Sequence, residues 1–119
     1  MKEKDLAKVV EDYLQLGENQ DKWTWDRLNS GAAFVEGRKI RSCRAGTADY
    51  MVWKSFTTSH GSVGGYKIIR RHCILTFIEL KGDKGKQRPS QKEFQARAEK
   101  HGAEYFIVKS LEQLQEILE

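Results

Sequence analysis

The first third of the chain changes from a helical to a strand-like spacing of apolar residues. Residues 3–16 place apolar side chains three and four positions apart, at Leu6, Val9, Val10, Tyr13 and Leu14. This spacing predicts an amphipathic helix, and Gly17 is its expected stop. After a polar linker, "WTWDRL" alternates as a strand does, with Trp23 and Trp25 on one face.

The middle of the chain predicts strands joined by turns. The passage 29–42, "NSGAAFVEGRKIRS", is hairpin-like, with bends at Gly31 and Gly37, and a strand is expected over 49–56. The polar, glycine-rich stretch "TTSHGSVGG" lacks a hydrophobic pattern and predicts a loop over residues 57–66. The apolar run "YKIIRRHCILTFIELK" predicts one long strand, or two joined by a bend.

The last third predicts a helix, a strand and a helix. The first helix starts with Ser90 as N-cap, with Pro89 just outside it, and ends with Gly102 as C-cap. "EYFIVK" is a short buried strand, and residues 110–118 form a closing helix. The predicted order is α-β-β-β-α-β-α, with three or four strands in the middle. This order predicts one α/β domain over residues 1–119, in which helices flank a mixed sheet. The final strand–helix–strand portion is expected to form a right-handed crossover.

Composition narrows the class of protein. Apolar residues make up 39% of the 119 residues and charged residues 32%, which favours a folded globular chain over a disordered one. No apolar run approaches the ~18 residues that a membrane span needs, and the charged start does not resemble a signal peptide. Cys43 and Cys73 fit a reduced compartment, although a single disulfide stays open. The expectation is a cytoplasmic protein without a membrane partner.

Charge is distributed unevenly along the chain. The net charge is +4, yet the first and last helices are rich in Glu, and three basic runs lie in the centre: "GRKIRSCR", "YKIIRRH" and "KGDKGKQR". Solvated loops are the simpler explanation, but three runs in one region favour a polyanion such as DNA. The candidate DNA contacts are Arg38, Lys39, Arg41, Arg44, Lys67, Arg70, Arg71, Lys84, Lys86, Arg88 and Ser90.

A carboxylate and an ammonium group end the longest apolar strand. Strand alternation puts Phe77, Glu79 and Lys81 on one face. A buried carboxylate is costly unless it is paired or binds a metal ion. Taken alone, Glu79 and Lys81 are best explained as an ordinary, half-exposed ion pair at a strand end. Asp49, however, begins another apolar strand, where it either caps a turn or converges with Glu79 on a divalent cation such as Mg²⁺.

The order of these residues resembles a known family. Gly46-Thr47-Ala48-Asp49, then Glu79-Leu80-Lys81, then Ser90-Gln91, Gly102, "YFIVKS" and "LEQLQEIL" follow the pattern of the VRR-NUC (virus-type replication-repair nuclease) domain of the PD-(D/E)xK nucleases. The opening "EKDLAKVVEDYL" also resembles the first helix of that family. The match covers nearly the whole chain, and its joint order is more specific than any one motif.

The resemblance implies a restriction-endonuclease-like fold and phosphodiester hydrolysis with Mg²⁺ or Mn²⁺. Asp49, Glu79 and the backbone carbonyl of Leu80 would bind the metal ion, Lys81 would be the catalytic lysine, and Gln91 would support the site. Glu3, or alternatively Glu11, would add a further acid. Viral and bacterial members of this size are typically homodimers that cut branched DNA such as four-way (Holliday) junctions.

Two alternative functions and one question about a segment remain open at the level of sequence. The protein is a non-catalytic module that binds DNA junctions, or it is a nuclease for flaps, single strands or DNA ends. In addition, the segment between the Asp49 strand and Glu79 is longer than is usual in the family. This segment either grips DNA, with Lys67, Arg70 and Arg71 on phosphates, or contacts a second copy of the chain.

Overall fold

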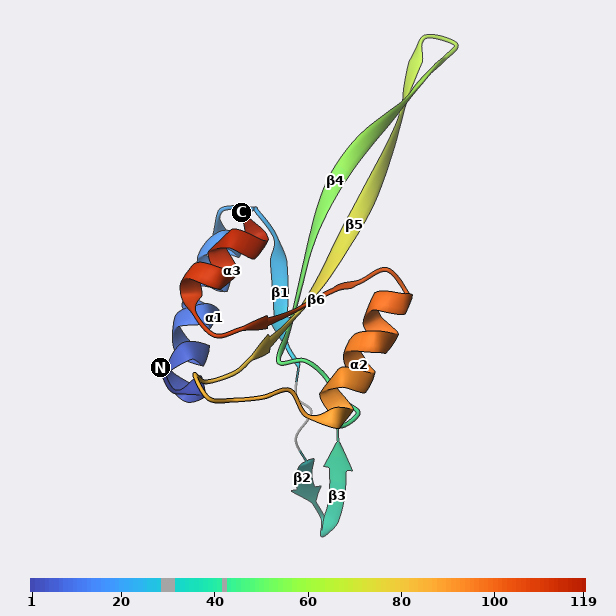
Figure 1. The fold of residues 1–119 in the computed structure, drawn as a ribbon. Coiled ribbons are helices and arrows are strands. Elements are labelled where there is room, and N and C mark those ends of the chain that lie inside the picture. The colour runs from blue at the N-terminus through green and yellow to red at the C-terminus, as the bar shows by residue number, and fades with distance from the viewer. Residues whose placement is uncertain (29–31, 42) are drawn as a thin grey trace.

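The computed structural model describes residues 1–28, 32–41 and 43–119, with residues 32–35 and 39–41 described by their backbone alone. Its elements are α1 (Glu3–Asn19), β1 (Thr24–Arg27), β2 (Ala32–Val35), β3 (Arg38–Arg41), β4 (Tyr50–Val63), β5 (Tyr66–Leu80), α2 (Pro89–Lys100), β6 (Glu104–Val108) and α3 (Leu111–Leu118). The predicted α/β class is confirmed (Figure 1). The predicted order is wrong in one respect: the described part of the chain has five strands between α1 and α2, not three or four, because β2 and β3 form an additional pair. Within the described ranges, no helix is both long and apolar enough to cross a membrane.

The main sheet has four strands in the order β1-β4-β5-β6. β4 pairs antiparallel with both β1 and β5, whereas β5 and β6 are parallel and are connected through α2. The mixed sheet predicted from the sequence is therefore present. β2 and β3 form a separate antiparallel pair beside the main body, joined by a turn at Glu36 and Gly37 (Figure 1).

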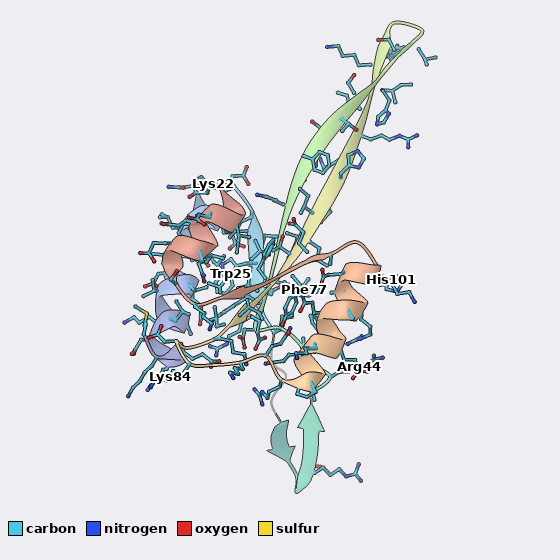
Figure 2. The ribbon with its side chains drawn as sticks, viewed as in Figure 1. Lys22, Trp25, Arg44, Phe77, Lys84 and His101 are labelled. Atoms are coloured by element: carbon cyan, nitrogen blue, oxygen red, sulfur yellow. The ribbon has the colours of Figure 1, made fainter. Side chains whose placement is uncertain are left out.

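Helices cover both faces of the sheet. Leu6, Val10 and Leu14 of α1 are fully buried, and they join residues of the sheet and of α3 in one hydrophobic core. Burying side chains of this size stabilises the fold by roughly 1.5–3 kcal/mol each. On the other face, α2 packs against the sheet through Phe94, whose ring meets that of Phe77 edge to face. Figure 2 shows Phe77 between the sheet and α2.

Three predicted helix boundaries are wrong. The C-cap of α2 is His101 and not Gly102, which follows it. α1 does not stop at Gly17 but continues to Asn19. A Cβ atom at position 17 would lie 2.0 Å from Cζ2 of Trp23, so Gly17 serves close packing of the helix against this indole. α2 begins one residue before Ser90, with Arg88 as N-cap and Pro89 in the first turn, where proline's missing N–H costs nothing.

The loop predicted over residues 57–66 is also wrong. β4 continues to Val63 and β5 starts at Tyr66, so a turn at Gly64 and Gly65, both with positive φ, joins two long strands. β1 pairs with β4 only as far as Trp53, and β6 meets β5 only from Thr76 onward. Residues 54–63 and 66–75 therefore pair only with one another, and we call this hairpin the arm.

The arm projects from the body as a twisted two-stranded ribbon (Figure 1). It accounts for the elongated shape of the molecule, which measures 61 × 33 × 27 Å. Residues 66–80 form one continuous strand, which decides between the two alternatives left open above. Because the outer part of the arm is exposed on both strands, its sequence has no need of the apolar alternation that marks a half-buried strand.

Candidate active site

Strand register brings Asp49 and Glu79 together. Tyr50 pairs with Ile78, so Asp49, one residue before β4, lies across from Glu79 near the end of β5. The backbone N–H of Leu80 donates a hydrogen bond of 2.7 Å to Oδ2 of Asp49. The two carboxylates therefore lie at the same end of the sheet, on neighbouring strands.

Glu79 is a buried carboxylate with one engaged oxygen and one free oxygen. Only 3% of its surface is exposed. Oε1 accepts a hydrogen bond of 2.6 Å from Nε2 of Gln91 and lies 3.7 Å from Nζ of Lys81. Oε2 is buried and has no hydrogen-bond partner in the part of the chain that the structure describes. Buried acceptors without a partner are rare in folded proteins, so this oxygen needs an explanation.

Gln91 links Glu79 to the start of α2. Its side-chain oxygen accepts a hydrogen bond of 2.8 Å from the backbone N–H of Arg88, while its amide nitrogen donates to Glu79. Both ends of the buried amide are thus satisfied. Gln91 therefore holds Glu79 in one orientation and couples it to the first turn of the helix.

Gly46 allows the turn before Asp49 to approach the first turn of α2. Gly46 has φ +86°, and a Cβ atom there would lie 2.3 Å from the carbonyl oxygen of Ser90. The turn before Asp49 consequently packs directly on the first turn of α2. Gly46 therefore brings the turn that carries Asp49 against the helical turn that carries Gln91.

Both carboxyl groups have raised pKa values. Burial, followed by the negative charge of Asp49, raises the pKa of Glu79 to about 7, although Lys81 opposes this effect. Burial also raises the pKa of Asp49, against the hydrogen bond from Leu80. Two carboxyl groups that resist ionisation together are stabilised in the charged form when a cation lies between them.

α1 places two further acids near this pair. A cleft of about 650 Å³ is lined by α1 together with Asp49 and Leu80, and both Glu3 and Glu11 border it. The Glu11 carboxylate accepts hydrogen bonds from the Tyr50 hydroxyl, at 2.7 Å, and from the guanidinium group of Arg27, at 3.3 Å. Glu3, in contrast, contributes to the raised pKa of both Asp49 and Glu79. Of the two candidates, Glu3 is the acid whose charge acts on the pair.

The donor set fits a magnesium-type site better than a zinc-type site. Among the described residues, no three His, Cys, Asp or Glu side chains lie close enough together to hold a metal ion. Mg²⁺ commonly takes only one or two carboxylates and completes its shell with water and substrate phosphate. Asp49, the free oxygen of Glu79 and the carbonyl of Leu80 are compatible with that pattern.

Tyr105 is a neighbour of the site that the sequence did not reveal. It lies on β6 opposite Phe77, two residues before Glu79, and is buried. Burial, with added effects of Glu79 and Asp49, raises its pKa to about 12. Only the parallel register of β5 and β6 brings it here, and the "YFIVKS" motif that contains it predicts only a strand, without a role for this residue in the site.

The predicted DNA contacts fall into separate groups. Arg44, Lys84, Lys86 and Arg88 are exposed in the two loops next to the site, and Ser90 is half-buried in the first turn of α2. Figure 2 shows Arg44 beside α2 and Lys84 close to the start of α1. Lys67, Arg70 and Arg71 are exposed on the arm, and Arg38 is exposed in β3. The side chains of Lys39 and Arg41, and the bend predicted at Gly31, lie outside the described residues.

Comparisons with known proteins leave the site to be interpreted from its own chemistry. No protein-family model matches the chain, and neither a curated protein nor a solved structure matches it.

Proposed function

We propose that this protein is a metal-dependent nuclease that hydrolyses phosphodiester bonds in DNA and has a restriction-endonuclease-like fold. One observation carries the proposal. Gln91 fixes the buried Glu79 carboxylate through one oxygen, whereas the other oxygen has no partner among the described residues. Asp49 lies next to Glu79, just before the neighbouring strand. A residue kept only for stability would be expected to have both oxygens satisfied.

Each side chain has a role in this chemistry. Asp49, Glu79 and the Leu80 carbonyl would hold Mg²⁺ or Mn²⁺, with Glu3 as an additional acid. When bound, the cation supplies Lewis-acid polarisation of the phosphate and offsets its growing negative charge. The Lys81 ammonium group, 5% exposed and held near Glu79, orients the attacking water and adds positive charge beside the scissile phosphate.

The proposed substrate is branched DNA, and the proposed active form is a homodimer. The exposed cations Arg44, Lys84, Lys86 and Arg88 border the site and can hold the phosphates on either side of the cleaved bond. A four-way junction has two-fold symmetry, so two matched nicks require two related active sites, which a symmetric dimer provides.

A cleavage panel tests the proposal. The protein is incubated with four-way junction, flap, nicked duplex and single-stranded DNA, in Mg²⁺, in Mn²⁺ and in EDTA. We expect metal-dependent cutting, strongest on the junction, and its loss in Glu79→Gln. The matched control is Glu99→Gln, which changes an exposed acid on α2. Cutting by Glu79→Gln at the wild-type rate would refute the proposed site.

A second candidate function is DNA binding without catalysis. The exposed cations of the arm and of the loops near the site favour it, since they suffice for binding alone. This alternative predicts salt-sensitive binding and intact DNA in every lane of the panel, with either metal ion. It leaves the unpartnered oxygen of Glu79 without a purpose.

A further inference from the structure

The arm carries positive charge and no negative charge. Residues 50–78 contain four Lys or Arg residues and not one Asp or Glu, in a chain that has 17 acidic residues. Lys54, at the base, donates a hydrogen bond to the carbonyl of Leu118 and so belongs to the body. Lys67, Arg70 and Arg71 are exposed further out, and none of them forms an ion pair within the described residues. The arm therefore presents three free cations.

The end of the arm exposes large apolar side chains among these cations. Val63, Tyr66 and Ile69 are 66%, 80% and 61% exposed. At the outer end of the arm, the side chains project into solvent with no other element beside them (Figure 2). A lone two-stranded hairpin is only marginally stable in water, so a ribbon that exposes apolar groups in this way is suited to a partner.

The length of the arm suits a nucleic acid partner. Ten residues on each strand extend it roughly 33 Å, at about 3.3 Å per residue. A two-stranded ribbon fits a groove of duplex DNA, and apolar side chains on DNA-binding arms contact sugars and bases while cations contact phosphates. A second copy of the chain is the competing occupant. Two such arms would repel each other, because neither carries an acid to pair with the cations of the other.

We propose that the arm is a DNA-binding ribbon that grips duplex DNA at a distance from the cleaved phosphate. Lys67, Arg70 and Arg71 contact backbone phosphates, and Val63, Tyr66 and Ile69 contact a groove. This inference rests on the proposed function in so far as DNA is the substrate. It adds that recognition of the duplex is divided between the loops beside the site and an arm whose tip lies roughly 50 Å from Glu79, at about 3.3 Å per residue along β5.

The charged part of the proposal is tested by the salt dependence of binding. The affinity for a duplex of roughly 30 base pairs, about 100 Å long at 3.4 Å per base pair, is measured in EDTA over a range of salt concentrations. The variant Lys67→Ala/Arg70→Ala/Arg71→Ala is expected to lower the slope of log K against log salt by about 2.7, at about 0.9 per phosphate contact. The control Lys92→Ala/Lys100→Ala/Lys109→Ala removes the same charge from the body and is expected to change the slope far less.

The apolar part is tested with Val63→Thr/Tyr66→Thr/Ile69→Thr. Threonine keeps the β-branched shape that favours a strand, and circular dichroism checks that the ribbon is retained. We expect affinity to fall about 5-fold or more with the salt slope unchanged, which is the lower end of the effect of losing one aromatic contact to a base.

Two further measurements separate this inference from the proposed nuclease activity. Hydrolysis of bis(4-nitrophenyl) phosphate needs the active site but no arm, so both arm variants should retain the wild-type rate. If no protein hydrolyses this ester while the arm variants still lose affinity for the duplex, the nuclease proposal fails and the arm proposal stands. Equal slopes for the arm and control variants would overturn the arm proposal. So would a loss of dimer mass in the arm variants with unchanged DNA binding, because the arm would then serve a second copy.

Discussion

Replacing Glu79 with glutamine tests the electrostatics of the site without reference to DNA. Glutamine has nearly the shape of a protonated glutamate, and it can still accept the hydrogen bond from Gln91. In the wild-type protein, burial and Asp49 raise the pKa of Glu79 from 4.5 to about 7. The folded protein therefore holds this proton more tightly than the unfolded chain does.

The sign and size of the effect follow from this difference. The free energy of unfolding of the wild type decreases as the pH rises from about 4.5 to about 7, and it stays at the lower value above that range. The reason is that the unfolded chain releases the proton at a lower pH than the folded protein does. At about 1.4 kcal/mol per pKa unit, the full effect is ~3 kcal/mol. The variant Glu79→Gln lacks this loss, so it should be more stable than wild type by ~3 kcal/mol at alkaline pH and by less than ~1 kcal/mol near pH 5.

Thermal unfolding in EDTA at about pH 5 and about pH 8.5 measures the difference. For a chain of 119 residues, ~3 kcal/mol corresponds to roughly 10 °C in Tm. The control Glu116→Gln changes an exposed acid on α3 and should follow the wild-type curve. Mg²⁺ at alkaline pH should raise the Tm of the wild type but not that of Glu79→Gln, since binding to the folded state alone stabilises it.

One result would refute the reasoning. Lys81 lies 3.7 Å from Glu79 and is itself buried, so glutamine leaves the ammonium group without this partner. If the attraction of the pair exceeded the cost of burying the carboxylate, Glu79→Gln would be less stable than wild type at alkaline pH. Parallel stability curves for the two proteins would likewise show that the carboxylate ionises as it does in water.

Three further predictions concern the same region. Lys81→Met should abolish cleavage of junction DNA, by 100-fold or more as is typical for a lost charge-stabilising group, while binding measured by anisotropy changes little; normal cleavage would exclude a catalytic lysine here. In urea titrations, Gly46→Ala should destabilise the fold by more than ~2 kcal/mol, because the added Cβ atom would meet the backbone of α2. The control Gly102→Ala, where φ is +91° but the surrounding space is open, should cost only about 1 kcal/mol. Glu3→Gln should lower the cleavage rate more than Glu11→Gln does, because the Glu11 carboxylate is already engaged; the reverse order would exchange their roles.

Local patterns in the sequence determined the elements and the residues of the site. The spacing of Leu6, Val10 and Leu14 predicted the buried face of α1, because helical periodicity depends only on neighbours along the chain. Strand alternation likewise placed Glu79 and Lys81 together. Convergence of Asp49 with Glu79 could be considered in advance because Asp49 begins one apolar strand and Glu79 lies near the end of another.

Tertiary structure decided what depends on partners distant in the sequence. Pairing with the opposite strand, and not burial, makes residues 57–63 a strand, so apolar periodicity could not reveal the arm. The packing of Gly17 on Trp23 turned an expected helix stop into a contact surface. The different surroundings of Glu3 and Glu11 likewise came from elements outside their own helix. Local spacing thus specified which side chains share a face, whereas the register between strands and the packing of α1 and α2 specified what those side chains meet.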